Sequence, residues 1–167
     1  IILGINSVEN YKTFNSLVLL DSDLNILSKY NKNNLVPFGE FLPFENFLSK
    51  LGLKKITQGY KSFSGSLARE FISDGKYKFL PLICYEIIFT GKLNKKSKHF
   101  DYIINISEDG WFGNSIGPEQ HFSHSIFRAI EEGKNLYRSS NNGISAHINP
   151  VGKIEDKIKS TQSLSLI

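Results

Sequence analysis

The strongest constraint on the fold is an apolar run at residues 79–89, whose sequence is FLPLICYEIIF. The run predicts a buried strand over residues 77–88 that presents a thiol and a carboxylate near its end. Burying Glu86 without a partner is costly, so a strand that only fills a core has no use for it. A lone cysteine is among the most buried residue types, so Cys84 by itself is compatible with a packing role. The carboxylate, separated from the thiol by one residue, favours a nucleophile at this position.

Other apolar segments alternate between strand and helix patterns. Strands are expected over residues 1–5, 14–20, 24–27, 101–107, 136–140 and 144–148, and helices over 44–51 and 118–133. A hairpin turn is expected at residues 21–23, a loop at 7–10 and a turn at 149–152. The apolar face of the second helix is expected to consist of Phe122, Ile126, Ala129 and Ile130. Several strands are apolar on both faces, so the sequence predicts an α/β class or a layered α+β sandwich.

Composition excludes several classes of function. The chain has 167 residues, 40% hydrophobic and 22% charged, which suits one domain spanning residues 1–167. Its net charge of +4 is mild and its lysines are scattered, so nucleic-acid binding is not expected. A single cysteine excludes an internal disulfide and a Cys-x-x-Cys zinc site, and neither a metal nor another cofactor is expected. No apolar run in the sequence is long enough to span a membrane.

Three polar clusters interrupt the apolar segments. They are YNKNNLVPFGE at residues 30–40, CYE at 84–86, and SEDGWFG at 107–113 followed by GPEQH at 117–121. Each residue has an ordinary structural interpretation when it is taken alone. Lys32 fits an exposed surface position, because lysine is rarely buried. Glu40 fits a loop acid, Trp111 fits a core position, and His121 fits a structural histidine.

The clusters contain four motifs in order: Tyr-x-Lys-x-x-Leu-Val-Pro-Phe-Gly-Glu, Ile-Cys-Tyr-Glu, Ile-Ser-x-Asp-x-Trp-Phe-Gly and Gly-Pro-x-Gln-His. Together they resemble the nitrilase, or carbon–nitrogen hydrolase, superfamily over residues 3–154. The long Leu-Val-Pro-Phe-Gly-Glu stretch, the Gly-Pro-x-Gln-His segment and RSSNNGIS at 138–145 resemble its apolipoprotein N-acyltransferase branch. Glu108 departs from the pattern, which usually has asparagine there. The resemblance implies a nitrilase-like four-layer α/β/β/α sandwich, truncated at its N-terminus.

The resemblance also implies a Glu–Lys–Cys triad in which Cys84 is the nucleophile. Lys32 matches the lysine whose ammonium stabilises the thiolate and the oxyanion. Glu40 and Glu86 match glutamates that hold this lysine and shape the charge of the site. The N–H of Tyr85 is expected to be a second oxyanion donor, because it directly follows the nucleophile. The side chains expected to line the substrate site are Tyr85 and Trp111.

The implied activity is transfer of a fatty acyl group from a phospholipid, through a cysteine thioester, to the N-terminal amine of an apolipoprotein. The implied location is the inner membrane of a Gram-negative bacterium, with this domain facing the periplasm and attached through segments outside the 167 residues. The family's general base is a glutamate before the lysine. Glu9 is the only acid there outside the hairpin turn, and it lacks the family's Pro-Glu context. The base is therefore expected to be missing from this chain. The absence of methionine also indicates a fragment of a longer protein, and the fragment alone is expected to be inactive.

Two other functions fit the same residues. A soluble amidase or nitrilase would use water as the acceptor in place of an amine. An inactive remnant of a split gene would account for the missing base. The feature that separates the acyltransferase from the amidase is the stretch LVPFGE at 35–40 with the Phe- and Leu-rich segment at 41–53. In the acyltransferase we expect this segment to border an acyl-chain entrance near the membrane surface. Its helical face fits a core position equally well.

Overall fold

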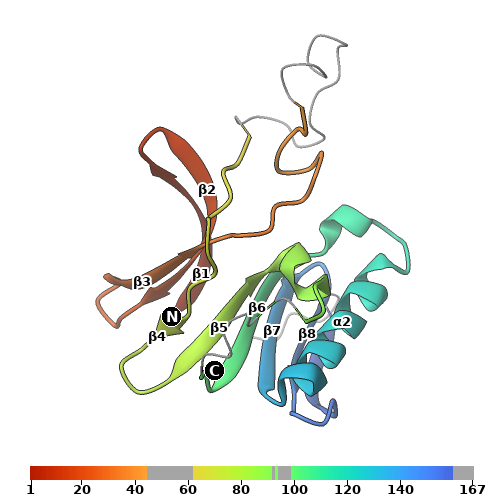
Figure 1. Cartoon of the computed structure of the whole chain (residues 1–167). Coiled ribbons are helices and arrows are strands. Elements are labelled where there is room, and N and C mark those ends of the chain that lie inside the picture. Colours follow the sequence, from red (N-terminus) through yellow and green to blue (C-terminus); the bar gives the residue numbers. More distant parts are fainter. Residues whose placement is uncertain (45–61, 92, 94–98, 160–167) are drawn as a thin grey trace. The chain divides into compact units, whose positions relative to one another are not determined.

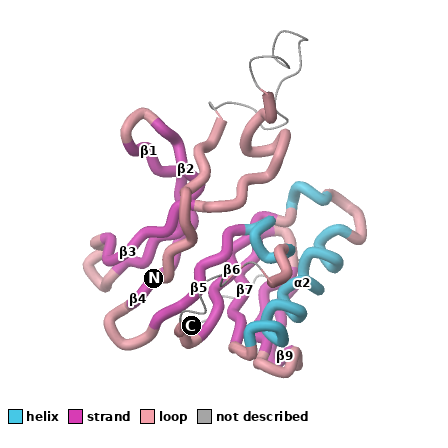
Figure 2. The backbone as a smooth tube through the Cα atoms, viewed as in Figure 1, coloured by secondary structure: helices cyan, strands magenta, loops and turns pink. Residues whose placement is uncertain are grey.

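The computed structural model describes residues 1–44, 62–91, 93 and 99–159 and divides the chain into two compact units, Ile1–Arg69 and Glu70–Ile167 (Figure 1). Each unit is built on a sheet of its own, and the helix α2 belongs to the second unit (Figure 2). Strands and helices alternate in the second unit, as the predicted α/β class requires.

The first unit is an antiparallel sheet of β1 (Ile2–Glu9), β2 (Lys12–Leu20) and β3 (Ile26–Asn31), in that order. Asn10 and Tyr11 both have positive φ and join β1 to β2, which is the backbone that suits the twist of a two-residue hairpin. The predicted hairpin between β2 and β3 is confirmed. In its turn, the Asp21 carboxylate accepts the N–H groups of Asp23 (2.9 Å) and Asn25 (2.8 Å).

The loop predicted for residues 7–10 is wrong, because β1 continues to Glu9. Its polar side chains pair across the sheet and do not turn the chain. The hydroxyl of Ser7 lies 2.7 Å from that of Ser16 on β2, and Glu9 forms an ion pair with Lys29 on β3. One side of this sheet therefore carries polar pairs, and these explain why residues 7–10 have a loop-like composition although β1 runs through most of them.

The second unit is a six-stranded sheet in the order β4 (Ile72–Ser73), β5 (Lys78–Ile83), β6 (Tyr102–Glu108), β7 (Asn135–Asn141), β8 (Ile144–Ile148) and β9 (Ile154–Lys159). The neighbours β5, β6 and β7 are parallel, and the other neighbours are antiparallel. Helix α2 (Gly117–Glu132) covers one face of this sheet (Figure 1). The core cluster of this unit contains Ala129 of α2 and the fully buried strand residues Leu80, Leu82, Ile103, Leu136 and Ile148. The strands predicted after residue 100 and the turn at 149–152 are confirmed.

Helix α2 begins and ends as predicted. Pro118 lies in its first turn, where a missing N–H costs nothing, and Gly133 ends it with a φ of +60°. Ala129 is buried as expected. Ile130 is 49% exposed, so its predicted core position is wrong. Its side chain lies against the turn at Gly152 and is not part of the core cluster.

Strand β5 is shorter than predicted. It ends at Ile83, and Cys84–Ile88 form a 3₁₀ helix, η2, so the strand expected to reach residue 88 is wrong. The Glu86 carboxylate accepts the N–H of Ile83 (2.9 Å) and holds the chain in this turn. Ile87 is still fully buried after the turn. The apolar pattern therefore continues through the change from strand to helix and conceals it.

The helix predicted over residues 44–51 lies outside the described residues except for Phe44, which is 83% exposed. Within the described part of the chain, no helix is long and apolar enough to cross a membrane.

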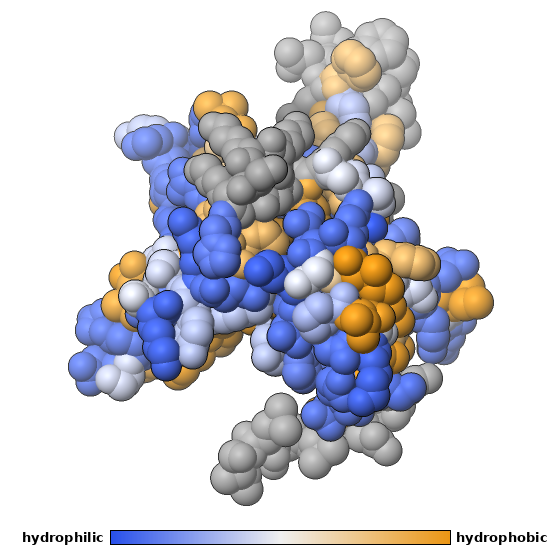
Figure 3. Space-filling model, turned by 60° about the horizontal axis from the view of Figure 1, so that its bottom comes forward, coloured by the Kyte–Doolittle hydropathy of each residue, from blue (hydrophilic) through white to orange (hydrophobic). Residues whose placement is uncertain are grey.

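Other exposed apolar side chains include Phe127 and Val151 in the second unit. Figure 3 shows hydrophobic groups set among hydrophilic atoms on the face that it presents. Apolar exposure of this kind is normal for a folded surface and marks no site by itself.

Candidate active site

Cys84 lies where β5 ends and η2 begins. Its φ is +49°, in the left-handed region that residues other than glycine rarely adopt. Holding a residue there costs of order 1–3 kcal/mol, and such strain is concentrated at active sites. The thiol is free and the residue is half-buried. A sharp turn from strand to helix that displays a partly accessible thiol is the geometry that a nucleophile needs.

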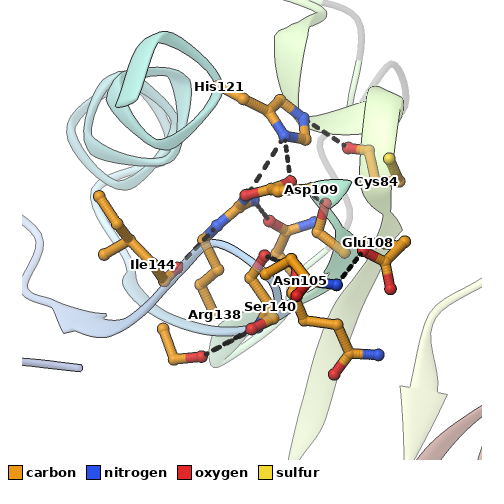
Figure 4. A network of polar contacts seen from close by, with 12 residues as sticks. Cys84, Asn105, Glu108, Asp109, His121, Arg138, Ser140 and Ile144 are labelled. Carbon is orange, nitrogen blue, oxygen red and sulfur yellow. Dashed lines mark hydrogen bonds and ion pairs between the residues drawn. The ribbon is translucent and has the colours of Figure 1, made fainter. Parts of the chain in front are cut away.

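A buried ionic network lies next to Cys84 within the second unit (Figure 4). The Asp109 carboxylate accepts hydrogen bonds from Arg138 Nη2 (2.7 Å) and from the hydroxyl of Ser107 (2.8 Å). Asp109 Oδ1 also lies 2.8 Å from Nδ1 of His121 on α2. The other ring nitrogen of His121, Nε2, lies 3.3 Å from the carbonyl oxygen of Cys84. The network thus extends to the backbone of the candidate nucleophile.

Asp109 is charged despite its burial. Burial by itself raises the pKa of this carboxyl group. The hydrogen bond with His121, the charge of Arg138 and the hydrogen bond from Ser107 outweigh the burial, and the net effect holds the pKa well below its ordinary range. A carboxylate and a guanidinium that are both buried compensate each other, so removing either one leaves an unmatched charge.

The register of the sheet brings the members of this network together. Asn105 on β6 lies opposite Arg138 on β7 and accepts a hydrogen bond from it. The amide of Asn105 then donates to the carbonyl of Leu82 on β5 (3.1 Å). Gly143, in the turn after β7, leaves room for Asp109, because a Cβ at that position would lie 2.1 Å from Asp109 Oδ2. The structure therefore explains two residues of the RSSNNGIS motif: Arg138 binds the carboxylate of Asp109, and Gly143 leaves room for it.

Lys32 and Glu40 form a buried ion pair in the first unit. Lys32 directly follows β3 and is 1% exposed, and its Nζ lies 2.8 Å from Glu40 Oε2. The same carboxylate accepts the amide of Asn15 (2.7 Å) and the N–H of Val36 (2.8 Å). Lysine is almost never fully buried unless it is paired. These contacts therefore hold one ammonium group in a fixed place, and the surface interpretation of Lys32 is wrong.

The other predicted site residues all belong to the second unit. Glu86 is fully buried and caps the turn described above. Tyr85 is half-buried. Trp111, in the short helix η3 (Gly110–Phe112), is 61% exposed, so its interpretation as a core residue is wrong. The Glu108 carboxylate is engaged in hydrogen bonds with the neighbouring turns. The structure thus places Lys32 and Glu40 in one unit and Cys84, Tyr85, Glu86 and Trp111 in the other.

The sequence assigns no site role to Asp109 or Arg138 and predicts a structural histidine at position 121. The structure places all three beside Cys84 (Figure 4). Each lies in a motif that carries the family resemblance, so a signal was present. Only the pairing of β6 with β7 and the start of α2 show that these motifs meet.

In the described part of the chain, no group of three or more His, Cys, Asp or Glu side chains is arranged to hold a metal ion.

The chain belongs to the carbon–nitrogen hydrolase family, whose model matches residues 1–164. Among its relatives, the apolipoprotein N-acyltransferase of Bradyrhizobium diazoefficiens is 43% identical over 143 residues, which are 85% of this chain and 27% of that protein. The apolipoprotein N-acyltransferase of Rickettsia prowazekii is 41% identical over 90% of this chain and 30% of its own length. That of Wigglesworthia glossinidia brevipalpis is 42% identical over 95% of this chain and 33% of its own length. The chain spans about a third or less of these curated relatives.

Solved structures of the superfamily have the same fold. An amidase from Nesterenkonia sp. superposes with a TM-score of 0.66 at 16% identity, covering 95% of this chain and 56% of that chain. XC1258 from Xanthomonas campestris, a CN-hydrolase superfamily protein, superposes with a TM-score of 0.65 at 15% identity, covering 93% and 56%. The prediction of an α/β, nitrilase-like fold is confirmed.

Proposed function

We propose that this chain is part of an enzyme that transfers a fatty acyl group from a phospholipid to the N-terminal amine of an apolipoprotein. The observation that carries the proposal is an identity of 41–43% over 85–95% of the chain to proteins named apolipoprotein N-acyltransferase. The strained, partly accessible thiol of Cys84 supplies the group that such chemistry needs. Amidases share the fold at 16% identity, which supports only the superfamily.

The reaction proceeds in two acyl transfers. Cys84 Sγ attacks the ester carbonyl of the phospholipid, and the thiol proton passes to a general base. The tetrahedral intermediate then expels the lysophospholipid alcohol, which takes up a proton, and an acyl thioester remains on the cysteine. The amine of the apolipoprotein attacks this thioester and gives up one proton, the C–S bond breaks as the amide forms, and the thiolate that leaves takes up the proton to restore the thiol. A covalent intermediate divides one difficult transfer into two easier steps.

Lys32 stabilises the negative charge that develops on the acyl carbonyl oxygen in this scheme. Its buried ion pair with Glu40 supports the role, because a preorganised charge stabilises a transition state without having to reorganise. The N–H of Tyr85 donates the second hydrogen bond to the oxyanion. Glu86 contributes by fixing the turn that carries the nucleophile. Tyr85 and the exposed Trp111 line the entrance for substrate.

The proposed acyl donor places the enzyme at a membrane. A phospholipid is presented from a bilayer, and the acceptor is a lipidated protein at the same surface. We therefore propose that the complete protein resides in the inner membrane of a Gram-negative bacterium, with this domain on the periplasmic side.

An acyl-transfer assay on the complete protein tests the proposal. The protein is supplied with phospholipid and a diacylglyceryl-cysteine peptide, and the N-acylated peptide is measured by mass spectrometry. Product is expected from the native protein and not from Cys84→Ser or Lys32→Met. Lys29→Met is the matched control, because Lys29 lies on β3, the strand that Lys32 directly follows, is partly exposed and pairs with Glu9. Full transfer by Cys84→Ser would overturn the proposal, and so would lipid-independent release of ammonia from small amides.

A further inference from the structure

Both ring nitrogens of the buried His121 have polar partners. It is almost fully buried near the start of α2, and each of its ring nitrogens faces a different polar group. Nδ1 lies 2.8 Å from Asp109 Oδ1 and 3.2 Å from Arg138 Nη2, while Nε2 lies 3.3 Å from the Cys84 carbonyl oxygen. Figure 4 shows the imidazole between the carboxylate and this carbonyl, with the sulfur of Cys84 directed away from the ring.

The proton on Nε2 follows from these partners. A carbonyl oxygen only accepts hydrogen bonds, so the contact with Cys84 requires hydrogen on Nε2. Nδ1 then either donates to Asp109, when the ring is doubly protonated, or accepts from Arg138, when the ring is neutral. Both forms donate from Nε2 to Cys84. Asp109 and Arg138 orient the ring in the way that a second partner orients a catalytic or metal-binding histidine.

Fixing the carbonyl of Cys84 also fixes the next N–H. The peptide between Cys84 and Tyr85 is trans, since the described chain contains no cis bond. In a planar trans peptide, the C=O and the following N–H point in opposite directions. A donor that holds the Cys84 carbonyl on one side therefore aims the Tyr85 N–H at the other side. The residue before Cys84 is held as well, because the carboxylate of Glu86 accepts a hydrogen bond from the N–H of Ile83 (2.9 Å).

We propose that His121, oriented by Asp109 and Arg138, is a positioning residue that sets the Cys84–Tyr85 peptide plane and thereby aims the Tyr85 N–H at the oxyanion. The inference rests on the proposed function, because it assumes an acyl carbonyl bound at Cys84. It adds a role that the nucleophile and the Lys32 ion pair do not supply. His121 touches neither the substrate nor the thiol in this scheme and acts only through the backbone.

Two reactions of the same thiol separate positioning from general folding. Acylation of Cys84 by a phospholipid passes through an oxyanion and needs the Tyr85 N–H. Alkylation by iodoacetamide is a displacement at a saturated carbon: the S–C bond forms, iodide leaves, and no oxyanion develops. Both rates are measured on the complete protein by mass spectrometry of the peptide that contains Cys84. The ratio of the acylation rate to the alkylation rate is the readout.

Three substitutions at position 121 test the contact with Cys84. In His121→Phe both ring nitrogens are lost, and we expect the ratio to fall about 10- to 100-fold, because a misdirected oxyanion donor loses most of its effect. In His121→Asn the amide replaces Nδ1 and keeps the Asp109 contact, and the ratio is expected to fall similarly. In His121→Gln the amide reaches the place of Nε2, and the ratio is expected to stay within about threefold of native. His124→Gln, a half-buried histidine on the same helix, is the matched control.

The outcomes distinguish this inference from the proposed function. A native protein that forms no thioester on Cys84 contradicts the proposed function itself. A native protein that forms it, with an unchanged ratio in His121→Phe and His121→Asn, contradicts only the role of His121. Equal loss of acylation and alkylation also contradicts positioning and shows a structural role. If His121→Phe does not fold, the comparison of His121→Asn with His121→Gln decides in the same way.

Discussion

Replacing Arg138 with methionine removes the guanidinium that is paired with the buried carboxylate of Asp109. The guanidinium donates hydrogen bonds to Asp109 (2.7 Å), to the carbonyl of Ile144 (3.1 Å) and to Asn105, and its Nη2 also lies 3.2 Å from Nδ1 of His121. Both charged side chains are fully buried, and breaking one side of such a pair costs about 3–5 kcal/mol. Asp109 keeps its contacts with Ser107 and His121, so we expect the lower end of this range, about 3 kcal/mol in the free energy of unfolding.

Urea unfolding of the 167-residue chain measures this loss, with the fluorescence of its single tryptophan, Trp111, as the signal. A loss of about 3 kcal/mol with a slope near 2 kcal/mol per molar urea lowers the midpoint by about 1.5 M. The double variant Arg138→Met/Asp109→Asn has no unmatched carboxylate, so it should recover more than about 1 kcal/mol relative to additivity. A loss below about 1 kcal/mol in Arg138→Met, or strict additivity in the double variant, would show that the two buried charges do not compensate each other.

Three further predictions concern the same two clusters. The pKa of Asp109 is lower in the folded chain than its unfolded value of about 4. The resulting stability is present above pH 4 and is lost as the pH falls below it. Between pH 3 and 5 the free energy of unfolding, measured with urea, should therefore fall less steeply in Asp109→Asn than in the native chain. Gly143→Ala places a Cβ 2.1 Å from Asp109 Oδ2 and should lower the free energy of unfolding by about 1–3 kcal/mol, and an unchanged midpoint would contradict the close packing. Glu40→Gln removes the charge that balances Lys32 and should cost about 2 kcal/mol or more in the same assay. Glu9→Gln, at a partly exposed pair, should change the midpoint much less.

The sequence predicts the elements whose signals are local. The hairpin of β2 and β3 follows from its polar turn, and α2 follows from Pro118 and Gly133 at its ends. Strand β1 is extended past its predicted end because cross-strand partners stabilise its polar residues. The sequence pattern does not reveal the turn at Cys84, because apolar buried residues occur both before it in β5 and after it in η2.

Long-range pairing limits what the sequence alone can say about the site. The motifs identify Cys84, Lys32, Glu40 and Glu86 as candidates through a resemblance. Nothing local in the sequence indicates that an arginine on β7 balances the acid after β6, or that a histidine on α2 reaches the backbone of Cys84. These contacts depend on strand register and helix placement, and both are properties of the folded chain.

Mass spectrometry can detect directly whether Cys84 carries the acyl group. The complete protein is incubated with a phospholipid that has an isotope-labelled acyl chain, without an acceptor, and is then digested. We expect the mass of one labelled acyl group on the peptide that contains Cys84. This group should be lost on treatment with neutral hydroxylamine or on addition of the acceptor amine. Formation of the N-acylated acceptor while Cys84 never carries the label would contradict transfer through Cys84.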